Sequence, residues 1–195
     1  AHPYPEGAAE AWISTHTAEW QTGSGMTFAV TLREGGGLVG APVEGDRGRR
    51  HIAFVLVEAT GATVAYRKMW LGGAEPDRFT PGTRPAVVVV DGWRLGLAIC
   101  KDTGVARHAA DTADLGIDGY VAGVLESADD AAVLEDRARR VATDHHVWVA
   151  LASFAGSTGG GYARAAGRSG IWTSDGVAIA RAGPETGAIA TGTLG

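Results

Sequence analysis

The sequence predicts one α/β or α+β domain over residues 1–195, built in layers with its helices on the outside. Three observations support this fold class. Strand-sized apolar runs outnumber helical patterns, hairpin turns and helical connections both join the strands, and the 30 glycines stand between apolar runs, where turns are needed. A chain of 195 residues, 45% of them hydrophobic, is long enough for one domain with a real core and too short for two.

The elements expected in the first hundred residues are mainly strands. The patterns at 7–20 and 26–34 are compatible with helices. Short apolar runs bounded by turn residues predict strands at 38–43, 51–59 and 62–68. Residues 86–100 indicate two more strands joined by Asp91 and Gly92, a pair typical of tight hairpin turns.

Helices and buried strands alternate in the second half of the chain. A helical pattern at 106–116 precedes a buried strand at 117–125. The amphipathic pattern at 127–146 predicts a helix with Ser127 as its N-cap, and it leads into a buried strand at 147–155. The tail, at 167–183 and 186–194, predicts a short antiparallel ladder that turns at Asp175 and Gly176.

The charge and cysteine content argue against several classes of protein. The net charge is −5 and the basic residues are scattered, which disfavours a nucleic-acid-binding surface. A single cysteine excludes an internal disulfide framework and a cysteine-rich zinc site. The apolar runs fall well short of the ~20 residues that span a membrane, and no signal-like stretch opens the chain, so we expect a cytoplasmic protein.

The single cysteine, Cys100, ends an apolar run and is followed by the turn sequence Lys101-Asp102-Thr103-Gly104 and then by a helical pattern. A thiol at such a strand-to-helix turn lies at the sheet edge, where backbone N–H groups and the helix dipole stabilise negative charge. We expect Asp102 to hold the turn through hydrogen bonds from its side chain to the backbone. The position suits a nucleophile, although a lone cysteine is also commonly a small core residue.

Two segments around Cys100 carry a family resemblance. The sequences AYRKMWLGGAEPDRFTPG at 65–82 and GLAICKD at 96–102 strongly resemble the carbon–nitrogen hydrolase family, also called the nitrilase superfamily. In that family a strand-end lysine precedes a glutamate, an F-x-P-G turn and a G-x-x-I-C-x-D cysteine turn. Further segments resemble the family at 4–7 (YPEG), 137–156 and 166–183. The resemblance implies a four-layer α-β-β-α sandwich of the nitrilase type and a homodimer or higher homo-oligomer.

The resemblance also implies a catalytic triad of Cys100, Lys68 and Glu6, with Glu75 as a second glutamate that orients the lysine or the substrate. The chemistry suits these residue types, because a carboxylate accepts the thiol proton and a lysine cation lowers the thiol pKa. The side-chain ammonium of Lys68 and the backbone N–H of Lys101 are the candidate donors that stabilise the oxyanion. The protonated glutamate gives its proton to the leaving amine and then activates water to hydrolyse the thioester. No metal or organic cofactor is required.

The chain departs from the family pattern in three places. Only five residues precede Glu6, whereas family members usually carry a first strand and helix there, so we expect those elements to be missing or supplied elsewhere. Ser153 stands where many relatives have Asn, and Val105-Ala106-Arg107 stands where the family often has an aromatic-Pro-Glu triplet. That triplet helps to build the substrate pocket, for which the candidate contact residues here are Lys101, Arg107, Glu126 and Tyr162.

The predicted function is hydrolysis of a non-peptide carbon–nitrogen bond in a small molecule, an amide by preference, with a nitrile or a carbamoyl compound also considered. Two alternatives stay open: an N-acyltransferase on the same scaffold, in which an amine resolves the thioester, and a non-catalytic relative that binds a small metabolite. His108, His145 and His146 raise the question of a metal site, but adjacent histidines point different ways and no carboxylate spacing completes a ligand set. We expect them to be polar residues at helix ends.

Overall fold

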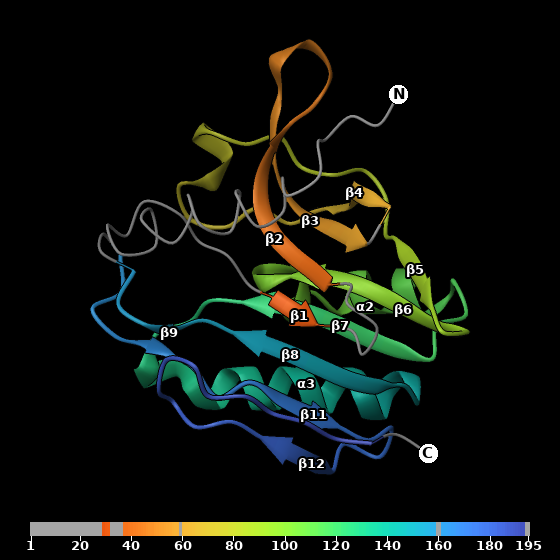
Figure 1. Ribbon diagram of the computed structural model, residues 1–195, viewed down its shortest axis with the longest axis vertical. Helices are drawn as coiled ribbons and strands as arrows, with labels where there is room; N and C mark the ends of the chain where they lie inside the picture. Colours follow the sequence, from red (N-terminus) through yellow and green to blue (C-terminus); the bar gives the residue numbers. More distant parts are fainter. Residues whose placement is uncertain (1–28, 32–36, 59, 159–160, 194–195) are drawn as a thin grey trace.

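The computed structural model describes residues 29–31, 37–58, 60–158 and 161–193. They form two β-sheets, a short two-stranded ladder and two α-helices (Figure 1). The helices are α2 (Ala106–Ala113) and α3 (Ala131–His145). Short 3₁₀ turns occupy Asp46–Gly48, Glu75–Asp77, Cys100–Gly104 and Ala128–Asp130.

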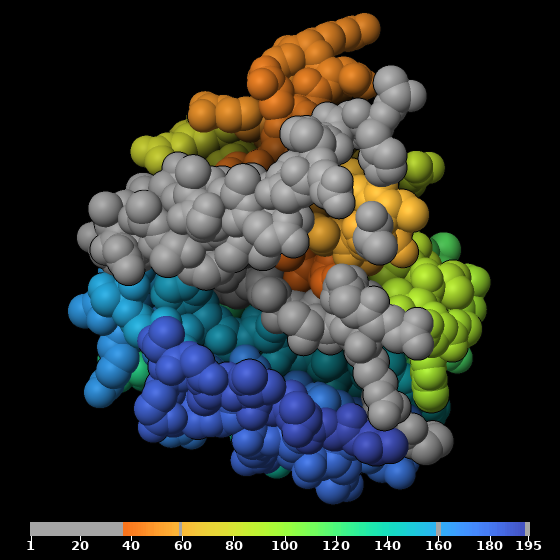
Figure 2. Space-filling model, viewed as in Figure 1, coloured from red at the N-terminus to blue at the C-terminus, as the bar shows by residue number. Residues whose placement is uncertain are grey.

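The first sheet is antiparallel throughout, with the strand order β1-β2-β3-β4. Its strands are β1 (Ala29–Thr31), β2 (Gly37–Glu44), β3 (Arg50–Glu58) and β4 (Gly61–Arg67). The hairpin formed by β2 and β3 projects beyond the rest of the molecule, as the orange segment of Figure 2 shows.

The second sheet has six strands in the order β12-β11-β8-β7-β6-β5. Its strands are β5 (Val87–Val90), β6 (Trp93–Ile99), β7 (Gly119–Val124), β8 (Trp148–Ser153), β11 (Gly170–Trp172) and β12 (Ala178–Arg181). Strands β6, β7 and β8 are parallel and are connected through α2 and α3, while the outer strands pair antiparallel. The separate ladder pairs β9 (Ala155–Gly156) with β10 (Ala165–Ala166).

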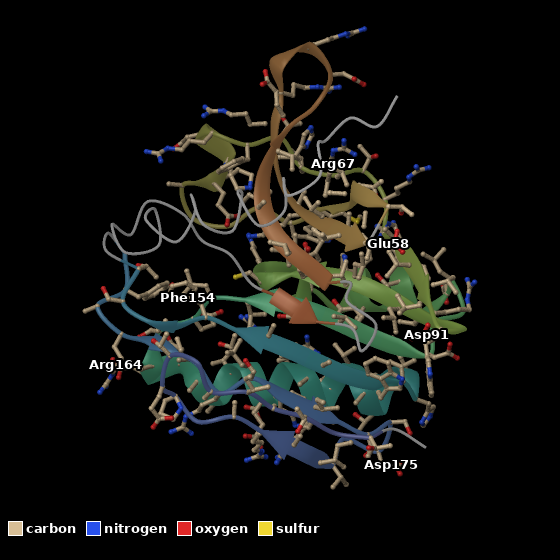
Figure 3. All side chains as sticks on the ribbon, in the orientation of Figure 1. Glu58, Arg67, Asp91, Phe154, Arg164 and Asp175 are labelled. Carbon is tan, nitrogen blue, oxygen red and sulfur yellow. The ribbon has the colours of Figure 1, made fainter. Side chains whose placement is uncertain are left out.

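The two ends of the six-stranded sheet carry different connections. Phe154, which follows β8, lies at one end together with Arg164, whereas Asp91 and Asp175 of the hairpin turns lie at the opposite end (Figure 3). Because parallel strands end at the same edge of a sheet, Cys100, which follows β6, belongs to the Phe154 end. In open sheets of this kind, ligands bind beyond the carboxyl ends of the parallel strands.

Both faces of the six-stranded sheet are covered. On one face, Leu95, Leu97 and Ile99 of β6 pack with buried residues of β2, β3 and β4. On the other face, Ala98 and Ala122 pack against α2 and α3. This alternation is the period-two burial expected of a strand whose two faces are both covered. The described residues therefore stack as helices, six-stranded sheet and four-stranded sheet, which are three successive layers of the α-β-β-α sandwich.

The predicted hairpins are confirmed by the structure. Strands β5 and β6 pair antiparallel across Asp91 and Gly92, whose φ angles of 50° and 84° both lie in the left-handed region. Two left-handed residues define the tight hairpin turn that this dipeptide favours. The turn at Asp175 and Gly176 likewise joins β11 to β12, and the N–H of Thr173 donates to the carbonyl of Val177 at 2.9 Å.

Three local predictions need correction. Residues 29–31, inside the segment predicted to be helical, form β1, because their backbone groups pair with β2 from Ala29↔Val39 to Thr31↔Gly37. The rest of the two N-terminal helical predictions lies outside the described residues. In the tail, 186–193 form no strand: the chain turns where the N–H of Ala188 donates to the carbonyl of Glu185 at 3.2 Å, and β12 remains the edge strand. The predicted helix at 127–146 begins as a 3₁₀ turn capped by Ser127, and α3 starts only at Ala131.

Candidate active site

The cysteine turn is the most constrained part of the candidate site. Cys100 has φ +49°, a left-handed conformation that costs a non-glycine residue about 1–3 kcal/mol and persists only where the surroundings hold it. The hydroxyl of Thr103 donates to the carbonyl of Cys100 at 2.7 Å, and Arg140 of α3 donates to the carbonyl of Thr103 at 2.9 Å. The half-buried Cys100 Sγ lies 3.6 Å from the carbonyl oxygen of Leu125, which follows β7. The turn thus presents the thiol at the carboxyl end of the sheet.

The electrostatic surroundings of the thiol oppose and assist its ionisation at the same time. Burial raises the pKa of Cys100, and the positive charge of Lys68 counteracts this rise. The carboxylates of Glu126 and Glu75 raise the pKa of Cys100 further, although their effects are smaller. A thiol in this environment needs a base to remove its proton before it attacks a substrate.

Lys68, which follows β4, is held as a buried cation. Its side-chain nitrogen donates to both carboxylate oxygens of Glu75, at 2.6 and 2.7 Å, and the residue is 2% exposed. Glu75 is itself fixed, because its Oε2 accepts the backbone N–H of Gly72 at 2.7 Å. A charge this buried requires such a partner, since an unpaired ammonium would lose several kcal/mol of solvation. The predicted association of Lys68 with Glu75 is therefore present in the structure.

The backbone of Lys68 is clamped on two sides. Its N–H donates to the carbonyl of Ile52 in β3, and its carbonyl accepts the N–H of Gly82, both at 2.8 Å. Gly82 ends the F-x-P-G segment, and a Cβ at this position would collide with the carbonyl oxygen of Arg67. Only glycine allows this close approach of two backbone segments. The loop between the lysine and the cysteine is thereby tied to the strand that carries the lysine.

Asp102 holds the cysteine turn as the sequence predicts. Its carboxylate accepts the backbone N–H of Ile99 and the backbone N–H of Trp70, both at 2.9 Å, and the residue is completely buried. His108, by contrast, is not a polar residue at a helix end. It is completely buried in α2, between the hydroxyls of Tyr66 and Tyr120. The sequence did not predict this burial, because it does not show which side of α2 faces the sheet.

The predicted substrate-contact residues divide into two groups. Glu126 and Tyr162 lie within electrostatic range of the thiol. The carboxylate of Glu126 raises the pKa of Cys100. The pKa of Tyr162 is raised mainly by burial, and Glu126 and Cys100 raise it further. Lys101 donates its side-chain N–H to the carbonyl of Leu71 at 2.7 Å. Arg107 is 80% exposed on α2 and pairs with Asp111 at 3.4 Å. The structure therefore does not bring Arg107 toward the thiol.

An ion pair beside the thiol was not predicted from the sequence. Arg137 of α3 donates to Oε1 of Glu126 at 2.9 Å, with both side chains largely buried. The guanidinium also lies close to Gly104, the last residue of the cysteine turn. The only signal in the sequence was the arginine-rich face of the 127–146 helix, which equally suits a solvated surface.

Three further predictions concern the catalytic glutamate, metal sites and membrane-spanning helices. Glu6 lies outside them. Among the residues that the structure describes, no group of three or more His, Cys, Asp or Glu side chains is placed to hold a metal ion. Within that same part of the chain, every helix is too short or too polar to cross a lipid bilayer.

Comparison with known proteins agrees with the fold and the motifs. The chain is 37% identical to an (R)-stereoselective amidase from Pseudomonas sp. over 73 residues, which are 37% of this chain and 27% of that protein. It resembles the structure of Nit3 from Saccharomyces cerevisiae, a member of branch 10 of the nitrilase superfamily, with a TM-score of 0.69 at 21% identity. That match covers 78% of this chain and 56% of Nit3.

A second solved structure has a similar fold. It is a mutant of the amidase from Nesterenkonia sp. AN1 that shows Michael addition of acrylamide at the active-site cysteine, with a TM-score of 0.65 and 20% identity. The match covers 78% of this chain and 61% of that amidase, so the chain spans less than two thirds of each of these three relatives. The model of the family described as carbon-nitrogen hydrolase matches residues 10–194. The chain is a member of the carbon–nitrogen hydrolase family, and its α-β-β-α sandwich is the fold of the nitrilase superfamily.

Proposed function

We propose that this chain hydrolyses a non-peptide carbon–nitrogen bond of a small amide, with Cys100 as the nucleophile. The observation that carries the proposal is the buried ammonium of Lys68, which is held by Glu75 and counteracts the rise in the pKa of a thiol at a left-handed turn. A purely structural cysteine has no use for a buried cation that opposes the rise in its pKa.

The proposed reaction has two halves. In the first, the thiol proton moves to a carboxylate, assigned to Glu6, while Sγ of Cys100 forms a bond with the amide carbon. The oxyanion then collapses, the carbon–nitrogen bond breaks, and the protonated carboxyl gives its proton to the leaving amine. In the second half, the carboxylate takes a proton from water and the resulting hydroxide attacks the thioester carbon. The carbon–sulfur bond then breaks, the carboxylic acid leaves, and the protonated carboxyl returns its proton to the thiolate.

Lys68 is the proposed electrostatic partner of the oxyanion. An ammonium has three N–H donors, and Glu75 accepts two hydrogen bonds from it, so with respect to the described residues one donor stays available for the substrate oxygen. The backbone N–H of Lys101, next to the nucleophile, is the second proposed donor. Two donors aimed at a developing negative charge are the usual oxyanion arrangement in acyl transfer.

The preference for an amide is supported by the relatives. The Pseudomonas protein is an amidase, and the Nesterenkonia amidase forms an adduct with acrylamide at its cysteine. Glu126 and Tyr162 are the proposed substrate contacts, because both interact electrostatically with Cys100. Nitriles and carbamoyl compounds belong in the same substrate screen, and a homodimer stays a prediction for the assembled protein.

The test is intact-mass spectrometry after incubation with a panel of small amides, nitriles and carbamoyl compounds. The unmodified chain should release ammonia and form an acyl adduct that accumulates in Glu6→Gln and is absent in Cys100→Ala. Transfer of the acyl group to an added amine in place of water would favour the N-acyltransferase. If neither adduct nor ammonia appears with any compound, the catalytic proposal is wrong and a metabolite-binding role replaces it.

A further inference from the structure

One buried carboxylate joins the segment of the nucleophile to the segment of the lysine. Asp102 accepts the N–H of Ile99, the residue before Cys100, and the N–H of Trp70, two residues after Lys68. These two segments come from different sheets, since β6 leads to Cys100 and β4 leads to Lys68. The position of this carboxylate therefore helps to set where the thiol lies relative to the ammonium.

The carboxylate is in turn oriented by a tyrosine hydroxyl. Tyr66 of β4 donates to Oδ2 of Asp102 at 2.7 Å and accepts the N–H of Met69 at 3.2 Å. A phenol has one proton to donate. Because that proton is directed at Asp102, the contact of 2.8 Å between the Tyr66 oxygen and Nε2 of His108 requires His108 to be the donor.

The chain of hydrogen bonds ends on the central sheet. Nε2 of His108 carries the proton, so Nδ1 is an acceptor, and the hydroxyl of Tyr120 donates to it at 3.0 Å. The side chains of Tyr66, His108 and Tyr120 are between 0% and 2% exposed. Burial lowers the pKa of His108 and raises the pKa of Tyr120, so both groups are neutral in the folded protein.

The arrangement spans all three described layers. Tyr66 belongs to the four-stranded sheet, His108 to α2 and Tyr120 to β7 of the six-stranded sheet. Each hydrogen bond fixes the direction of the next, because every hydroxyl proton has one acceptor and the imidazole has one tautomer. Removal of the last donor leaves Nδ1 of His108 without this partner, so the tautomer that donates to Tyr66 is no longer enforced, and the Tyr66 hydroxyl loses one of the contacts that orient it.

We propose that His108 and Tyr120 are positioning residues for the reaction: they orient the Tyr66 hydroxyl toward Asp102, and this carboxylate then holds Cys100 in register with Lys68. This inference rests on the proposed hydrolysis, but it makes a prediction about the thiol that does not depend on turnover. Neither residue touches the reacting atoms, and both lie outside the motifs that carry the family resemblance.

The experiment compares Tyr120→Phe with the core variant Val141→Ala, which removes apolar volume from the same buried cluster but no hydrogen bond of this network. On an amide substrate, Tyr120→Phe should lower kcat about tenfold with KM nearly unchanged, because misplacement of reacting groups slows the chemical step more than binding. Val141→Ala should lose thermal stability and keep its kcat. Equal kcat in the two variants, or losses that follow only the fraction unfolded, would overturn the proposal.

A second readout works without any substrate. The rate of Cys100 alkylation by acrylamide is measured against pH, and the midpoint of the profile should move to higher pH in Tyr120→Phe, because Lys68 no longer lies in register with the thiol. An unchanged midpoint contradicts the positioning role, even if no amide is ever hydrolysed.

A pair of histidine variants separates positioning from packing. His108→Gln retains an N–H donor near the position of Nε2, whereas His108→Leu retains volume without a donor. The glutamine variant should recover a larger share of the parental kcat and alkylation profile than the leucine variant. Equal behaviour of the two variants at matched stability would show that His108 serves packing alone.

Discussion

At the scale of single residues, the candidate site is a balance between burial and charge. The same burial that hides Cys100 from water raises its pKa, and Lys68 is the only nearby cation that acts against this rise among the interactions described for the thiol. Lys68 remains charged in the interior because Glu75 accepts two hydrogen bonds from it. The pKa of the thiol therefore depends in part on a lysine whose own burial is unusual.

Replacement of that lysine gives a direct prediction. Lys68→Met removes the positive charge that lowers the pKa of Cys100 and leaves Glu75 unpaired, and both changes disfavour the thiolate. The alkylation of Cys100 should therefore be slower at about pH 8, and its profile should move to higher pH. Lys101→Met is the matched control, because Lys101 adjoins the thiol in sequence but donates its side-chain proton to Leu71. Equal effects of the two variants would argue against a specific role for Lys68.

Candidate site residues could be predicted from the sequence only where they belong to a recognisable local motif. Cys100, Lys68 and Asp102 were found in this way, and the structure places Lys68 near the thiol and Asp102 on the turn. His108 and Arg137 were missed in their roles. Their contacts depend on which side of a helix meets the sheet, and a charged or polar residue on a helix is usually solvated.

At the scale of elements, close contact between α2 and the sheet depends on small residues. Gly96 lies in the middle of β6, and a Cβ there would stand 2.5 Å from Cγ2 of Thr112 and 2.8 Å from Cδ1 of Ile117. The helix that carries His108 can approach the strand that carries Cys100 only because this side chain is absent.

Gly96→Ala should therefore push α2 away from the sheet and lower the free energy of unfolding by about 1–3 kcal/mol. The measurement is urea unfolding followed by circular dichroism. Gly192→Ala is the control, because a Cβ at Gly192 would meet its nearest neighbours at 3.4 Å or more, which is ordinary contact. A loss in Gly96→Ala no larger than that in the control would show that the helix adapts without cost.

At the scale of the whole molecule, the buried neutral histidine links stability to pH. His108 has a pKa below its ordinary value of 6.5 because burial disfavours the charged ring, so the unfolded chain binds more protons than the folded one at mildly acidic pH. Stability contributed by the neutral ring is fully present above about pH 6.5 and is lost as the pH falls below that value. Asp102 and Asp111 act in the opposite direction, and their effects are smaller.

The urea concentration at the unfolding midpoint should accordingly decrease as the pH is lowered from about 7.5 to about 5.5. In His108→Gln the decrease should be smaller, because the glutamine side chain does not titrate. The comparison uses the slope of stability against pH and not its absolute value, since the variant also loses contacts. Parallel slopes for the two proteins would mean that other groups dominate the acid sensitivity.

The sequence by itself determined the hairpin turns, most of the strand segments and the motif residues of this protein. Strand-length apolar runs, the Asp-Gly turns and the cysteine turn depend on residues that are neighbours in the chain, so they can be recognised from the sequence alone. Only the tertiary structure decided the order of the strands outside these hairpins, that 29–31 join a sheet, and that His108 and Arg137 face inward. Those outcomes depend on contacts between residues far apart in the chain, such as the 42 positions between Tyr66 and His108, and burial is a property of the assembled layers.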